Sequence, residues 1–400
     1  MTKFYLGVDV GKYNHQAALI NENGLVLTPA YKFANQSQAI NELCQTIKKQ
    51  LPDKQTAVKV GMEATGHYYW HLRDELLKQG FEVVVFNPIE TQTKAKLKLR
   101  KVKNDRIDSL IIADLVREKD LKKQGETTSF NQPDERLKEL RQLTRFTTRL
   151  KKQARFYKQG ITVLLERICP EFESCFKNVF SKTALVVMRE YFIKNISEKK
   201  LINLMAKTSR GRIKTEQAKE IIQALNNSLG LSYRNESAKL ELSILLDDLG
   251  TKLSQIKQLE QRIKDMSENI KEVELIASIK GVSERMASVI YAEISNINRF
   301  EKKEQLTAFA GLDPAVKQSG TYLRKQGNHI SKRGPKYLRQ ELYFAAKTAI
   351  IFDPELKAYY LKKKTEGKHY NCIMIAISRK ILMRIWAVLK QKRPYELRTA

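Results

Sequence analysis

The sequence predicts an α/β domain at the N-terminus, followed by a long antiparallel coiled coil and a mostly helical C-terminal domain. Three observations predict this architecture. Runs of β-branched and aromatic residues alternate with amphipathic helical patterns over about the first 120 residues. Two apolar stripes with three-and-four spacing then lie on either side of a central insertion. From Leu275 onward, the pattern is that of a helix, a short hairpin containing glycine, and a second helix.

Seven elements precede a final helix in the N-terminal region. In order, they are strands at 4–10, 15–20 and 25–33, a helix at 37–49, a strand at 57–62, a helix at 68–79 and a strand at 81–86. The Asn23-Gly24 pair predicts a tight turn between the second and third strands, so the first three strands should form an antiparallel meander. This order is the topology of the ribonuclease H-like (RuvC-like) fold, which we expect over residues 1–128.

Four carboxylates fall where such a fold carries acids, at strand ends and on the final helix. Asp9 in GVDVG lies in the C-terminal part of the first strand, and Glu63 in GMEATG lies at the tip of the fourth. Asp105 and Asp108 share one face at the start of the helix in NDRIDSLIIADL. Each alone has an ordinary explanation, as a turn residue, a helix cap or a charge favoured by the helix dipole. Together they predict a site for Mg²⁺ or Mn²⁺, which prefer hard oxygen ligands.

Residues around the four acids predict contact with a phosphate backbone. Glycines that flank the acids would allow a close approach; they are Gly7, Gly11, Gly61 and Gly66. The run KAKLKLRKVK, directly before the aspartate helix, has six basic side chains and no acid: Lys94, Lys96, Lys98, Arg100, Lys101 and Lys103. Lys12 follows the first acid. We expect these cations to hold a backbone without reading bases, the alternative being a solvated loop.

Composition indicates a polyanionic partner. The chain has 400 residues, 42% of them hydrophobic, and a formal net charge of +29. That charge exceeds what solubility needs, so nucleic acid is the leading partner. A membrane-surface role would need a basic amphipathic tail or a lipidation signal, and the sequence has neither. Four cysteines without a CxxC pair, together with no signal-peptide pattern, favour a reducing cytoplasm.

The middle of the chain is expected to form a helical arm. The apolar stripes at 134–165 and 236–274 predict the two helices of the antiparallel coiled coil, and 166–235 is an insertion at its far end. The outer faces of both stripes are strongly charged. A rigid spacer or a dimerisation arm is the favoured interpretation, and the insertion contains no motif that indicates a function.

The C-terminal region, 275–400, contains two features that suit phosphates. The segment LIASIKGVSERMASVIYAEI resembles a helix-hairpin-helix element, whose second helix can receive a phosphate at its N-terminus. The segment FAGLDPAVKQSGTYLRKQGNHISKRGPKYLR is rich in glycine and cations, and its candidate contacts are Gly320, Arg324, Lys325, Lys332, Arg333 and Arg339. Ser319 precedes Gly320, and a serine beside glycine is ordinarily a turn residue.

Taken together, four motifs resemble those of a known family. GVDVGK, GMEATGHYYW, NDRIDSLIIADL and FAGLDPAVKQSG with ISKRGPKYLR are similar to the "one-ten" insertion-sequence transposases, the DEDD recombinases guided by a bridge RNA. The resemblance covers about the first 120 and the last 125 residues. It implies that Asp9, Glu63, Asp105 and Asp108 bind two metal ions and that Ser319 is the nucleophile, with Ser331 as the alternative serine.

The resemblance also implies partners and a reaction. The enzyme would cut and rejoin donor and target DNA through a phosphoserine ester, as a dimer or tetramer with a noncoding RNA, in a bacterial or archaeal cytoplasm. Three other readings remain open. A structure-selective nuclease of the Holliday-junction type would use water in place of serine. A phosphotransferase of the actin and sugar-kinase class would use GVDVG as a phosphate loop, and a nucleic-acid-binding scaffold would leave the carboxylates without a role.

Overall fold

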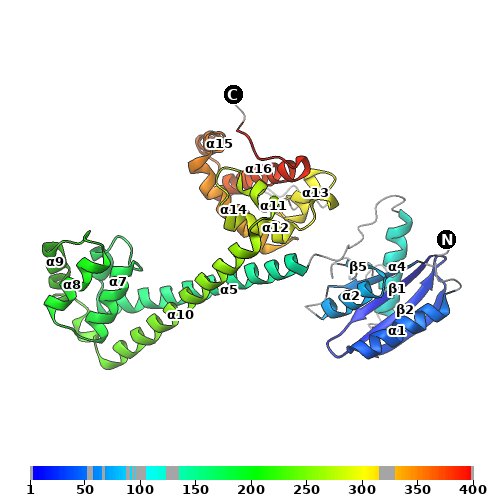
Figure 1. The fold of residues 1–400 in the computed structure, drawn as a ribbon, viewed down its shortest axis with the longest axis horizontal. Helices are drawn as coiled ribbons and strands as arrows, with labels where there is room; N and C mark the ends of the chain where they lie inside the picture. Colours follow the sequence, from blue (N-terminus) through cyan, green and yellow to red (C-terminus); the bar gives the residue numbers. More distant parts are fainter. Residues whose placement is uncertain are drawn as a thin grey trace, which may run out of the picture. The chain divides into compact units, whose positions relative to one another are not determined.

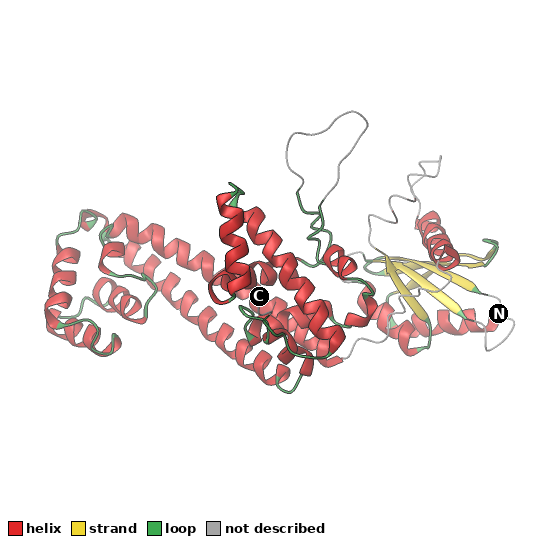
Figure 2. Cartoon of the chain, turned by 90° about the horizontal axis from the view of Figure 1, so that it is seen from above, coloured by secondary structure: helices red, strands yellow, loops and turns green. Residues whose placement is uncertain are grey.

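The chain forms two compact units, Met1–Asp134 and Glu135–Ala400. The computed structural model describes residues 3–51, 57–64, 68–86, 91, 94, 105–122, 135–314 and 329–397. The first unit contains the sheet, and the second is built from helices (Figures 1 and 2).

A five-stranded mixed sheet forms the centre of the first unit, with the strand order β3-β2-β1-β4-β5. Its elements are β1 Phe4–Val10, β2 Asn14–Asn21, β3 Val26–Ala34, α1 Ser37–Gln50, β4 Val58–Glu63, α2 Tyr69–Lys78, β5 Glu82–Phe86 and α4 Asp105–Lys122. The first three strands are antiparallel neighbours, whereas β4 and β5 run parallel to β1. The predicted meander and the predicted order of elements are therefore confirmed.

Helices cover both faces of this sheet. Apolar residues of α1 and α2, such as Leu43 and Leu72, pack with Val8 and Val60 on one face. On the other face, residues of α4 such as Ile112 form a separate core with the sheet. β1 is therefore buried between two layers of helix, which agrees with its nearly continuous apolar sequence.

Two glycines of the sheet allow α4 to pack directly against it. A Cβ atom added to Gly7 would lie 2.0 Å from the backbone oxygen of Ser109, and one added to Gly61 would lie 2.2 Å from a methyl group of Val116. Gly7 and Gly61 are partners in the register of β1 and β4. The prediction that these two glycines face a phosphate backbone is therefore wrong, because the space beside them is filled by a helix. Gly66 lies outside the described residues.

The C-terminal end of α4 is fastened to the beginning of the sheet. The carboxylate of Asp120 is 5% exposed and accepts from Lys59 at 2.5 Å, from Tyr5 at 2.9 Å and from Lys3 at 3.1 Å. Burial alone would raise the pKa of Asp120, but these hydrogen bonds outweigh it and lower the pKa. Since Ser109 lies against the middle of β1, α4 runs antiparallel to β1, with its first turn toward the C-terminal end of that strand.

Two long antiparallel helices, α5 and α10, span much of the second unit and lie side by side in both views (Figures 1 and 2). Arg262 of α10 pairs with Glu139 near the start of α5, and Glu241 of α10 pairs with Arg167 near its end. The helices of this part are α5 Glu135–Ile168, α6 Phe172–Cys175, α7 Lys182–Val187, the π-helix Met188–Ile193, α8 Glu198–Thr208, α9 Thr215–Asn226, the 3₁₀ turn Leu231–Tyr233 and α10 Glu236–Ser267. The short helices enclose a core with the ends of α5 and α10.

The C-terminal helices share one apolar core. They are α11 Lys271–Ala277, α12 Glu284–Ile294, the 3₁₀ turn Ile297–Arg299, α13 Lys303–Phe309, α14 Lys336–Phe352, α15 Pro354–Thr365 and α16 Tyr370–Gln391. Between α11 and α12, Gly281 has φ +91° and packs against Ala349 of α14. Nowhere in the described ranges is a helix both long and apolar enough to cross a membrane.

Candidate active site

Asp9 and Glu63 lie next to each other at the C-terminal ends of two adjacent parallel strands. Val8 of β1 is the partner of Met62 of β4, and each acid is the next residue of its strand. Residues in register on neighbouring parallel strands point to the same face. That face is the one covered by α4, because Gly7 and Gly61, two residues before the acids, contact α4. Both carboxylates are partly exposed.

The first turn of α4 supplies the remaining predicted acids. Since α4 runs antiparallel to β1 and Ser109 lies against Gly7, the residues before Ser109 extend toward the strand ends. Asp108 is partly exposed there. Asp105 begins the helix, and its side chain lies outside the described residues. The start of α4, which carries both aspartates, is therefore oriented toward the strand ends that carry Asp9 and Glu63.

Thr91 contacts Glu63 at these strand ends, and no pattern in the sequence singles it out. Its hydroxyl is buried and donates to Oε2 of Glu63 at 2.5 Å. A hydrogen bond of this kind fixes the orientation of a carboxylate that binds a metal ion. A threonine 28 residues beyond its partner, with no periodic pattern around it, gives no detectable signal in a single sequence.

The donor set suits a hard divalent cation. Two carboxylates on adjacent strands repel each other unless a cation lies between them. Oxygen ligands alone, without cysteine or histidine, are typical of Mg²⁺ and Mn²⁺ sites. Among the described side chains, which do not include that of Asp105, no group of three or more His, Cys, Asp or Glu is close enough together to hold a metal ion.

The predicted phosphate contacts of the first unit have different environments. Lys12 is exposed, and its ammonium lies 4.8 Å from the ring centroid of the exposed Tyr13. Lys94 instead pairs with Asp114 at 2.8 Å and Glu118 at 2.5 Å on α4. The other basic residues of that run, Lys96, Lys98, Arg100, Lys101 and Lys103, lie outside the described residues.

Burial of the Asp114 carboxyl would raise its pKa. The ion pair with Lys94 and the hydrogen bonds from Arg117 outweigh that effect and lower the pKa. Lys94 is thus joined to α4 by two ion pairs. That is a structural contact which the sequence pattern did not indicate.

The segment that contains Ser319, 315–328, lies outside the described residues, as do Gly320, Arg324 and Lys325. The residues on either side of it, 311–314 and 329–334, form what we call the stem. In the stem, Pro314 and Ile330 form an antiparallel bridge, and the hydroxyl of Ser331 donates to a carboxylate oxygen of Asp313. Pro314 and Ile330, which lie on either side of this segment in the sequence, are therefore held side by side.

The basic residues of the stem differ in accessibility. Lys332 and Arg333 are exposed. Arg339, at the start of α14, donates to the backbone oxygens of Ala310 at 3.1 Å and Gly334 at 2.5 Å. Burial lowers the pKa of Arg339. This guanidinium supports the backbone of the stem, whereas the sequence had indicated only a phosphate contact for it.

The sheet order and the acids at its central strand ends are consistent with a ribonuclease H-like domain of the DEDD type. Two family models match the chain. A transposase model, of the DEDD transposases of IS110, matches residues 6–170, and the model "Transposase IS116/IS110/IS902 family" matches residues 273–361. The chain belongs to this family of insertion-sequence transposases.

Curated relatives agree with this assignment. The chain is 25% identical over 404 residues to the "Insertion element IS116 uncharacterized 44.8 kDa protein" of Streptomyces clavuligerus, covering 98% of this chain and 96% of the relative. It is 23% identical to the "Pilin gene-inverting protein" of Moraxella lacunata, covering 100% and 99%. It is 29% identical to the "Transposase for insertion sequence element IS1111A" of Coxiella burnetii, over 42% of this chain and 46% of the relative.

Proposed function

We propose that this protein cleaves and rejoins DNA at the ends of an insertion sequence, with a metal-dependent carboxylate centre and a serine nucleophile. One observation carries the proposal most directly. Asp9 and Glu63 occupy matching positions on adjacent parallel strands, on the face covered by the helix that begins at Asp105. Family membership supports DNA as the substrate.

The carboxylates and the serine would have separate roles. Asp9, Glu63, Asp105 and Asp108 would hold two Mg²⁺ or Mn²⁺ ions, which supply charge stabilisation for the attacking and leaving oxygens when bound. Thr91 would orient Glu63 through the hydrogen bond at 2.5 Å. The hydroxyl of Ser319 would attack phosphorus, so that one phosphate ester bond forms as another breaks. The DNA end stays linked to the protein and keeps an ester bond for rejoining to a new partner.

The remaining parts of the chain would position nucleic acid. A guide RNA that pairs with donor and target DNA would supply sequence specificity, while the exposed Lys12, Lys332 and Arg333 contact backbone. The start of α12 would act as the phosphate-receiving end of a helix-hairpin-helix element. The α5 and α10 pair would form a coiled-coil arm that joins protomers into a dimer or tetramer.

Removal of divalent metal is the experiment that tests this function. We expect the protein to cleave DNA carrying the element's junction in Mg²⁺ or Mn²⁺, and to produce no cleaved or rejoined strands in excess EDTA. Binding of the same DNA, followed by a mobility shift, should persist in EDTA, because the basic residues hold the backbone without the metal. Equal amounts of cleaved DNA with and without EDTA would contradict the proposal.

A further inference from the structure

Helix α5 carries a cationic charge that its partner helix does not balance. From Arg141 to Lys158 it contains seven basic residues and no acid: Arg141, Arg145, Arg149, Lys151, Lys152, Arg155 and Lys158. Helix α10 contains five basic and six acidic residues over its whole length. Like charges one turn apart on a helix repel each other and destabilise it. The basic run therefore does not stabilise α5 by itself. Its presence indicates a ligand of opposite charge.

Contacts within the protein neutralise only part of this charge. Arg145 pairs with the buried Glu293 at 2.6 Å, and Lys151 pairs with Glu260 of α10 at 2.5 Å. Arg141 donates to the backbone oxygen of Ala292 at 2.6 Å. In the part of the chain that the structure describes, none of the other four basic residues of the run forms an ion pair with a carboxylate; these are Arg149, Lys152, Arg155 and Lys158.

Three basic residues of α5 line a cleft of about 390 Å³, which we call the arm cleft. They are Lys151, Arg155 and Lys158, and their spacing of four and three residues places them on one face of the helix. Residues of α10, α12 and α14 form the remaining walls, including Arg285 and Phe344. The lining has four basic and two acidic side chains, so the cleft carries a net positive charge.

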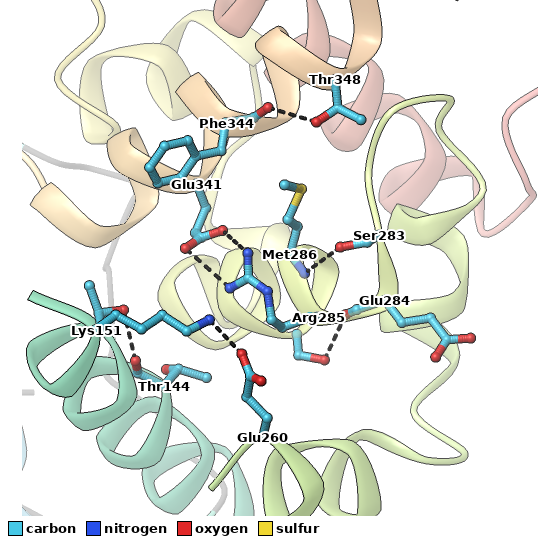
Figure 3. A network of polar contacts seen from close by, with 12 residues as sticks. Thr144, Lys151, Glu260, Ser283, Glu284, Arg285, Met286, Glu341, Phe344 and Thr348 are labelled. Atoms are coloured by element: carbon cyan, nitrogen blue, oxygen red, sulfur yellow. Dashed lines mark hydrogen bonds and ion pairs between the residues drawn. The ribbon is translucent and has the colours of Figure 1, made fainter. Parts of the chain in front are cut away.

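The two acidic residues of the arm cleft serve to join its walls (Figure 3). Arg285 of α12 donates to both carboxylate oxygens of Glu341 of α14, at 3.4 and 3.1 Å, and Glu341 is 4% exposed. Lys151 donates to Glu260 across the helix pair. Since these four charges pair with one another, the unbalanced charge belongs to Arg155 and Lys158. Arg155 is exposed, and the ammonium of Lys158 lies 5.0 Å from the ring centroid of Phe180.

We propose that the arm cleft binds the phosphodiester backbone of a nucleic acid through Arg155 and Lys158. A guanidinium and an ammonium donate charge-assisted hydrogen bonds to phosphate oxygens, and a helix face with cations one turn apart can follow successive phosphates. The net charge of +29 makes a polyanion a better partner than a single small anion. The inference rests on the proposed function, in which the protein acts with DNA and RNA. Both of these carry a phosphodiester backbone.

Salt dependence of binding tests the arm cleft. The full-length double variant Arg155→Gln with Lys158→Gln is titrated with a 30-base-pair DNA duplex and with a 30-nucleotide single-stranded RNA at several salt concentrations. Loss of two phosphate contacts should reduce the magnitude of the negative slope of log K against log salt by about 1.8 for the duplex or about 1.4 for the single strand. The charge-conserving variant Arg155→Lys with Lys158→Arg should retain the original slope.

A matched control removes the same charge elsewhere. Lys199 and Lys200 at the start of α8 are exposed, and the double change of both to Gln should leave the slopes unchanged. A reduced slope with RNA alone would identify RNA as the backbone in the cleft, and one with DNA alone would identify DNA. Slopes of the Arg155 and Lys158 variant that match the control for both probes would overturn the inference. An unaltered protein that binds neither probe would instead overturn the proposed function.

Discussion

The variant Asp9→Asn is expected to lose DNA strand cleavage by about a thousandfold while it keeps its fold, because asparagine has the same size but carries no charge. Asp9 lies one residue before the end of the central strand β1, beside Glu63 on the face covered by α4. Single-turnover cleavage of DNA carrying the element's junction, in Mg²⁺, measures the effect.

The matched control for this change is Asp74→Asn. Asp74 lies on α2, which covers the opposite face of the sheet, and pairs with Arg73 at 2.7 Å. Its variant should cleave at the rate of the unaltered protein. A folded Asp9→Asn protein that cleaves as fast as the Asp74→Asn control would exclude Asp9 from the metal centre.

Gly7→Ala is expected to destabilise the first unit by about 3 kcal/mol, because a Cβ atom there would overpack a well-filled interface. That atom would lie 2.0 Å from the backbone oxygen of Ser109 and 2.3 Å from the backbone nitrogen of Ala113. Backbone atoms cannot move aside as a side chain can, so α4 must shift away from β1. Since α4 also carries Asp108, cleavage should fall together with stability.

Hydrogen exchange measures this effect within the full chain. Amide protons of β1 and α4 should exchange faster in Gly7→Ala, while those of the C-terminal helices keep their rates. Gly250→Ala is the control, because a Cβ atom at this position of α10 would have no neighbour within 4 Å. That change should stabilise its helix, by up to about 1 kcal/mol. Unchanged exchange of β1 and α4 in Gly7→Ala would contradict the packing argument.

The order of strands and helices in the first unit could be predicted because local patterns determine it. Alternating apolar runs and the Asn23-Gly24 turn define the meander, and the apolar run that contains Asp9 defines the first strand. The placement of Asp9 and Glu63 in neighbouring strands follows once that topology is recognised. The individual elements depend on residues close to one another in the sequence, whereas the pairing of Asp9 with Glu63 depends on the recognised topology.

The packing and ion pairs that individual residues make with distant segments could not be predicted. A glycine such as Gly7 indicates that something approaches the backbone closely, but the sequence does not say whether it is a phosphate or the helix at Ser109. In the same way, Lys94 belongs to a basic run, yet its partners Asp114 and Glu118 lie 20 and 24 residues further along the chain. A charge becomes a structural ion pair or a ligand contact only through tertiary packing.

Formation of a covalent bond between the protein and DNA tests the central claim most directly. The protein, with any bound RNA retained, is incubated with Mg²⁺ and labelled DNA carrying the element's junction, and the products are separated under denaturing conditions. Our account predicts a DNA-linked protein band that is absent from Ser319→Ala, although this variant still binds DNA. Free nicked DNA in equal amounts from both proteins, without a linked band, would contradict the account and indicate a nuclease that uses water.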